Sequence, residues 1–94
     1  MERLQEEATL QEAVETFGSS SQVDMCIEEC SELIQALCKL KRGRDTNVEE
    51  EIADCLIMLE QMQFIFDREK VQQFYFDKLE RLALRIRNHK LKSK

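Results

Sequence analysis

The chain contains no proline, and its only two glycines are Gly18 and Gly43. Proline and glycine are the residues that most often interrupt helices, so their scarcity favours long, uninterrupted helices. Both glycines lie where one apolar pattern ends and the next begins. The sequence therefore predicts an all-α protein whose helices are separated by short connections.

Apolar residues recur at three- and four-residue spacings over four stretches, as on the buried face of an amphipathic helix. The predicted helices cover about residues 4–17, 22–42, 48–66 and 68–88. Ser21 and Asp67 are candidate N-caps, and either Thr46 or Asn47 can form a capping box with the glutamate three residues later. Short connections favour antiparallel neighbours, so residues 1–94 are predicted to form one domain, a four-helix antiparallel bundle.

The third predicted helix is apolar on every side after its first turn. The run from Ile52 to Leu59 carries one charged side chain, that of Asp54. A helix that is apolar all round is buried all round, and a short chain buries only a modest part of its surface alone. We therefore expect the chain to assemble with further copies of itself. An ionised carboxylate in such surroundings is costly without a cation against it, so Asp54 is expected to have one.

Charge and composition narrow the partners and the location. The formal net charge is −5, which disfavours a nucleic-acid backbone as a partner. No apolar run reaches the roughly 20 residues that span a bilayer, so no membrane partner is expected. The first residues are acidic and do not resemble a secretion signal. We expect a soluble, cytoplasmic protein.

Four cysteines occur without a secretion signal, and the lone histidine lies in the polar C-terminal stretch. A zinc site needs more ligands than this arrangement offers, and disulfides are rare in reducing compartments. The cysteines are therefore predicted to be reduced thiols packed in a core, and they are Cys26, Cys30, Cys38 and Cys55.

Two carboxylate pairs flank the connection between the second and third helices. Glu29 with Glu32, and Glu51 with Asp54, are each spaced by three residues, so each pair shares a helix face. If the antiparallel helices bring the pairs together, the carboxylates repel unless they are protonated or bound to cations. Hard oxygen ligands select Mg²⁺, Mn²⁺ or Ca²⁺. The alternative is a solvated acidic surface, with Asp54 paired to a lysine or arginine across an interface.

The same residues resemble a family signature. Glu28-Glu29-Cys30-Ser31-Glu32 and, after an 18-residue gap, Glu51-Ile52-Ala53-Asp54 are similar to the EExxE…ExxD pattern of MazG-like all-α NTP pyrophosphohydrolases. The stretch Phe76 to Leu82 resembles the closing helix of that family, which bears lysine and arginine. The resemblance extends from about Gln22 to Ile86, which is most of the chain.

The resemblance implies an enzyme that hydrolyses a nucleoside or deoxynucleoside triphosphate to the monophosphate and pyrophosphate, in nucleotide-pool house-cleaning. It implies Mg²⁺ as cofactor, with Mn²⁺ as an alternative, and assembly as a homodimer or homotetramer. The implied metal ligands are Glu29, Glu32, Glu51 and Asp54. Glu28 and Glu32 are the implied catalytic residues that assist the attacking water.

Lys78 and Arg81 are the implied phosphate contacts. The family often has a second arginine directly after the position of Arg81, and here that residue is Leu82. Two alternatives stay open: a non-enzymatic helical oligomerisation module, and a metal- or nucleotide-binding regulator with the same fold. The sequence does not indicate a base or sugar preference.

Overall fold

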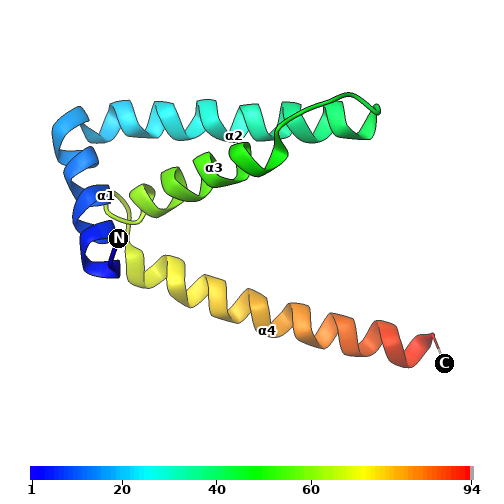
Figure 1. Cartoon of the computed structure of the whole chain (residues 1–94). Helices are drawn as coiled ribbons and strands as arrows, with labels where there is room; N and C mark the ends of the chain where they lie inside the picture. Colours follow the sequence, from blue (N-terminus) through cyan, green and yellow to red (C-terminus); the bar gives the residue numbers. More distant parts are fainter. Residues whose placement is uncertain (94) are drawn as a thin grey trace.

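The computed structural model describes residues 1–93, which form four helices and no strand (Figure 1). The helices are α1 (Arg3–Phe17), α2 (Ser19–Lys41), α3 (Val48–Met62) and α4 (Arg68–Lys92). The prediction of an all-α chain is confirmed. No helix of the described part has an apolar stretch long enough to cross a membrane.

The junction between α1 and α2 is tighter than predicted. Gly18 ends α1 with a φ of 92°, and its N–H donates to the carbonyl of Val14 over 2.9 Å. A positive φ at this position suits glycine, which has no Cβ. The next helix begins directly at Ser19, with Gly18 as its N-cap and no side-chain cap. The prediction that Ser21 caps this helix is therefore wrong, because the serines already lie within its first turn.

Two side-chain caps stabilise the N-terminal ends of α3 and α4. The Asn47 side chain accepts a hydrogen bond from the backbone N–H of Glu50 at 3.4 Å and donates one to the Glu50 carboxylate at 2.6 Å. Helix α3 ends at Met62, earlier than predicted, and the chain tightens into a turn over residues 63–66. Asp67 caps α4 by accepting from the backbone N–H of Lys70 at 3.1 Å, as predicted. The final helix continues beyond the predicted end, to Lys92.

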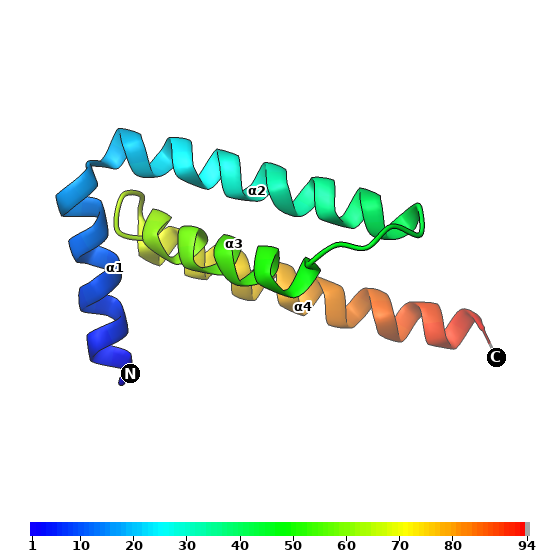
Figure 2. The ribbon, with the colours of Figure 1, turned by 45° about the horizontal axis from the view of Figure 1, so that its top comes forward.

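The core lies among the first three helices. Helices α2 and α3 pack along each other as an antiparallel pair, and α1 packs across one end of that pair (Figures 1 and 2). The buried apolar side chains are Leu10, Val14, Ala36, Cys55 and Met58. This is a small core, because each helix contributes only a narrow buried stripe.

Helix α4 does not join this core within one chain. Beyond its first turn, it packs against none of the other described helices, and it contains no buried residue (Figure 1). The predicted four-helix packing is therefore not closed in a single chain. The predicted buried stripe of α4 is exposed, and it consists of Val71, Tyr75, Leu79, Leu82 and Ile86.

The apolar run of α3 is also open on its outer side. Leu56 is 58% exposed and Leu59 is 50% exposed, and Asp54 is only half-buried. The expectation that this run is buried is not met in one chain, because α3 has α2 and α1 as neighbours but no further helix of residues 1–93 on its remaining face. Helices α3 and α4 therefore both leave apolar side chains uncovered in a single chain.

One ion pair holds the start of α4 beside α1, and a second joins α1 to the last turn of α3. The Arg68 guanidinium lies 2.9 Å from the Glu7 carboxylate and stacks over the Phe64 ring, 5.6 Å from its centroid. Arg3 lies 3.1 Å from the carboxylate of Glu60, near the end of α3. The hydrogen bond from Arg68 lowers the pKa of Glu7. These contacts set the direction in which α4 leaves the helix pair.

Candidate metal centre

Three carboxylates meet between α2 and α3. Glu29 on α2 and both Glu51 and Asp54 on α3 each offer one oxygen, and these three oxygens lie within 4.8 Å of one another. We call these residues the carboxylate triad. The thiol of Cys55 donates to the backbone carbonyl of Glu29, with Sγ and O 3.2 Å apart. This contact fixes the level of α3 against α2 and so helps to place Asp54 opposite Glu29.

The triad has oxygens without hydrogen-bond partners. Glu29 Oε2 and Glu51 Oε2 are both buried and unpaired, although each residue as a whole is half-buried. Within residues 1–93, no lysine or arginine forms an ion pair with any of the three carboxylates. Unpaired buried carboxylate oxygens are costly, and a bound cation removes that cost. The donor set therefore fits a hard divalent cation.

The pKa shifts of the site carboxylates also favour a bound cation. Loss of solvent contact raises the pKa of Glu29, and the charges of Glu32, Asp54, Glu51 and Glu28 raise it further, in that order. The pKa of Glu51 is raised by loss of solvent contact, then by Glu32 and Asp54. Both shifts arise because like charges are held together away from water.

Comparison with known proteins places this site within a family. The family model described as the MazG nucleotide pyrophosphohydrolase domain matches residues 17–83 of the chain. The chain belongs to the MazG family. The match covers more than two thirds of the sequence and includes the triad. No curated protein and no solved structure matches the chain.

MazG membership confirms the predicted family and supports a nucleotide pyrophosphohydrolase kind of activity. The family is metal-dependent in general, in agreement with the acidic cluster. The matched region ends within α4 and includes Lys78 and Arg81.

Glu29 and Glu32, the two metal ligands predicted on α2, do not occupy equivalent positions. Glu32 lies outside the triad, but after loss of solvent contact its charge contributes most to raising the pKa of Glu51. Glu28 is exposed, and its charge has the smallest of the effects on Glu29. By spacing alone, Glu29 and Glu32 were equivalent. The level of α3 against α2 is what places Glu29 nearer to Asp54.

Within one chain, Lys78 and Arg81 are not brought to the triad. Both lie on α4, which does not pack against α2 or α3. Together with Arg85 they line an open hollow of about 300 Å³ on one side of α4.

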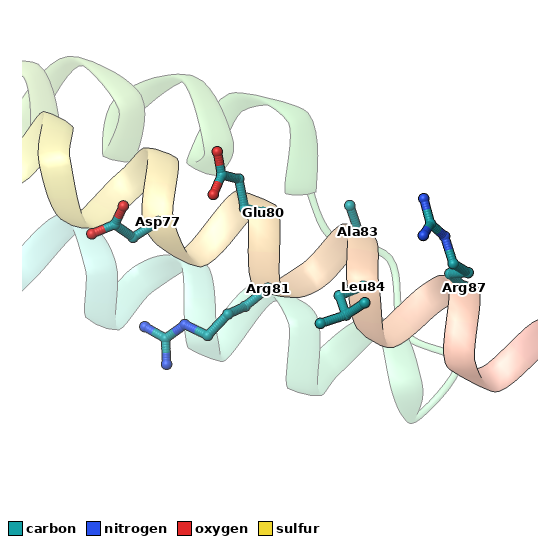
Figure 3. Close-up of a pocket in the computed structure, with 6 residues that line it drawn as sticks. All are labelled: Asp77, Glu80, Arg81, Ala83, Leu84 and Arg87. Carbon is teal, nitrogen blue, oxygen red and sulfur yellow. The ribbon is translucent and has the colours of Figure 1, made fainter.

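A larger hollow on α4, of about 550 Å³, lies along a neighbouring face (Figure 3). Its lining residues are Asp77, Glu80, Arg81, Ala83, Leu84 and Arg87. Figure 3 shows them spread along this single helix, with acidic groups toward its start and Arg87 further along. No residue of the triad contributes to this hollow, so it is not part of the candidate metal centre.

The thiols of Cys26, Cys30 and Cys55 lie near one another where α2 meets α3 in this MazG domain. The four cysteines are free thiols, as predicted, but Cys38 is exposed and not in the core. The pKa of the Cys55 thiol is raised to about 11. Burial is the main cause, and the neighbouring Cys30 thiol raises the pKa further. The prediction treated Cys55 only as a small apolar residue and missed its contact with the Glu29 carbonyl. In the sequence, its position directly after Asp54 was the one indication that Cys55 lies close to the carboxylates.

Proposed function

We propose that the protein is a Mg²⁺-dependent nucleoside triphosphate pyrophosphohydrolase. The reaction adds water to a nucleoside or deoxynucleoside triphosphate and yields the monophosphate and pyrophosphate. The observation that supports it most is the carboxylate triad, whose oxygens lie within 4.8 Å of one another and include two that are buried and unpaired. Membership of the MazG family supports the same class of reaction.

In this proposal Glu29, Glu51 and Asp54 hold the metal, and Glu32 completes the ligand set from its place beside Glu51. Mn²⁺ is the alternative ion, because it accepts the same oxygen ligands. When bound, the metal neutralises triphosphate charge and lowers the pKa of a coordinated water. The protein contributes the fixed positions of its carboxylates on two packed helices.

The remaining roles follow from position. A carboxylate beside the triad accepts the proton of the attacking water, and Glu32 and Glu28 are the two candidates on α2. Glu32 already lies beside Glu51, whereas Glu28 is exposed on the solvent side. Lys78 and Arg81 are proposed to contact the phosphates, which requires α4 to approach a helix pair that it does not touch within one chain.

The activity is tested by measuring pyrophosphate release from a panel of nucleoside and deoxynucleoside triphosphates in the presence of Mg²⁺. We expect Glu51→Gln and Asp54→Asn each to lower the rate by more than about 100-fold, because loss of a ligand should exceed the 10–100-fold typical of outer partners. Glu12→Gln is the matched control, since Glu12 is an exposed glutamate on α1. Full activity in both triad variants would contradict the proposal.

The panel also addresses specificity. Nucleotide-pool house-cleaning predicts broad use of noncanonical triphosphates, whereas a narrower enzyme prefers one deoxynucleotide. Diphosphates should be included as possible substrates. A regulator with the same fold would bind nucleotide and Mg²⁺ without releasing pyrophosphate.

A non-enzymatic oligomerisation module is favoured by one observation, the exposed apolar surface of α3 and α4. It leaves the carboxylate triad without a role. Thermal stability separates the two hypotheses, because an ion that binds only the folded state stabilises it by about 2.7 kcal/mol at 100 times its Kd. A module should have the same melting temperature with and without Mg²⁺. We propose that assembly into a dimer or tetramer accompanies the enzymatic activity.

A further inference from the structure

One hollow on α4 is lined by cationic side chains alone. It has a volume of about 300 Å³, and its lining residues are Lys78, Arg81 and Arg85. Spacings of three and four residues place them on one face, within about 60° of one another around the helix axis and about 10 Å along it. Side chains of a helix lean toward its N-terminus, so Arg85 reaches back toward Arg81. The three cations therefore gather at one place on the helix surface.

The cations of this hollow are not paired within residues 1–93. All three are exposed, and none of them forms an ion pair in that part of the chain. The nearest acidic residues along α4, Asp77 and Glu80, line the other hollow. Figure 3 shows Arg81 pointing away from Glu80 and from Arg87. Like charges three and four residues apart destabilise a helix slightly, and a bound anion removes that repulsion.

The proposed metal centre does not supply all the positive charge that a triphosphate needs. One Mg²⁺ carries two positive charges, whereas the triad carries three carboxylates when it is ionised. The site therefore stays negative with one ion bound, and the further phosphates need cations from another element. Arginine and lysine bind phosphate oxygens, and arginine does so with two parallel hydrogen bonds. Helix α4 presents three such cations together.

The residue directly after Arg81 differs from the MazG pattern. The family often has a second arginine there, and this chain has Leu82. Leu82 belongs to the apolar stripe of α4 and does not bind an anion. Arg85 follows one turn after Arg81, and its direction from the helix axis lies between those of Lys78 and Arg81. It also lies beyond the matched residues 17–83, so the family match assigns it no role.

We propose that Arg85 is a third phosphate-binding residue, which acts with Lys78 and Arg81 on the β- and γ-phosphates of the substrate. The inference rests on the proposed function and extends its phosphate contacts to a residue outside the family match. The bond between the α- and β-phosphates breaks in this reaction, and cations beside the β- and γ-phosphates stabilise the charge that develops there. Arg85 therefore contributes to kcat as well as to KM.

Replacing Arg85 tests this role against a matched control. Arg85→Ala removes the guanidinium, and Arg85→Lys keeps the charge without the paired hydrogen bonds. The control is Arg87→Ala, because Arg87 is also exposed but lies about 160° away around α4, in the hollow with Asp77 and Glu80.

The first measurement is the rate of pyrophosphate release over a range of triphosphate concentrations with Mg²⁺. We expect Arg85→Ala to lower kcat/KM about 10- to 100-fold, as the loss of a hydrogen bond to a charged group does. Arg85→Lys should recover part of this loss. Arg87→Ala should stay within about twofold of wild type, because solvent screens a charge on the far side of the helix.

The second measurement follows binding without catalysis. Calorimetric titration in the presence of Mg²⁺ gives the Kd of inorganic pyrophosphate and of a nucleoside monophosphate, which lacks the β- and γ-phosphates. We expect Arg85→Ala to raise the pyrophosphate Kd at least about tenfold and to change the monophosphate Kd by less than about twofold. Arg87→Ala should change neither. Circular dichroism checks that each variant keeps its helix content.

The outcomes separate this inference from the proposed function. Equal effects of Arg85→Ala and Arg87→Ala, or no effect of Arg85→Ala, would overturn the inference and leave the function standing. Equal weakening of pyrophosphate and monophosphate binding would also overturn it, because that result indicates a general effect of charge. A wild-type protein that releases no pyrophosphate would contradict the function instead, and the pyrophosphate titration would still decide whether Arg85 binds this anion.

Discussion

Shortening Leu79 to alanine tests whether the apolar stripe of α4 holds copies together. Leu79 is 47% exposed in one chain and lies in line with the apolar residues Tyr75 and Ile86. Burying a leucine completely stabilises by about 1.5–3 kcal/mol, so covering the exposed half contributes about 1 kcal/mol. A symmetric dimer contains two such side chains. Leu79→Ala should therefore weaken association by about 2 kcal/mol, close to a 30-fold rise in the dimer Kd.

The matched control is Leu84→Ala. Leu84 has a similar exposure of 53%, but it lies five positions later on the opposite side of α4, among the charged residues of Figure 3. Sedimentation equilibrium over a range of protein concentrations gives the Kd of each variant. Helix content measured by circular dichroism checks that both variants remain folded. An equal effect of the two substitutions, or none from Leu79→Ala, would refute the assignment of the apolar stripe to the interface.

Two further predictions concern the triad and the cysteine thiols. The pKa of Glu51 is raised above its ordinary 4.5, so the folded protein binds this proton more tightly than the unfolded chain and loses stability as pH rises above 4.5. Without divalent ions, Glu51→Gln should therefore melt at a higher temperature than wild type near pH 7, with the difference shrinking toward pH 4.5; an unchanged difference contradicts the proposed repulsion. Cys38 is exposed, whereas the pKa of Cys55 is about 11, so iodoacetamide at neutral pH should label Cys38 first and Cys55 only after unfolding, as followed by mass spectrometry.

The features that the sequence predicted correctly depend on local spacing. The four helices follow from apolar periodicity and from the scarcity of proline and glycine, and Asp67 caps α4 as an acidic residue before a helix should. The approach of Glu29 to Glu51 and Asp54 also follows, because a short connection makes α2 and α3 antiparallel. Each of these inferences needs only neighbouring residues or one turn.

The features that the sequence did not predict depend on contacts between helices. Spacing gave no reason to separate Glu32 from Glu29, and the hydrogen bond from Cys55 that sets their levels joins residues far apart in the chain. The apolar stripe of α4 correctly indicated a face to be covered, but periodicity does not say which molecule covers it. The same limit applies to Asp54, whose apolar neighbours indicated a burial that one chain provides only in part.

If one substrate contacts metal ligands from one copy and cations from another, substrate binding and assembly are thermodynamically linked. A ligand that binds the assembled protein more tightly must favour assembly by the same factor. Both the triad and α4 contribute to this linkage. Within residues 1–93, no lysine or arginine forms an ion pair with the triad, and no residue of the basic helix α4 is buried. A nonhydrolysable triphosphate with Mg²⁺ should therefore lower the dimer Kd of wild type, and this effect should be lost in the variant that lacks Lys78 and Arg81.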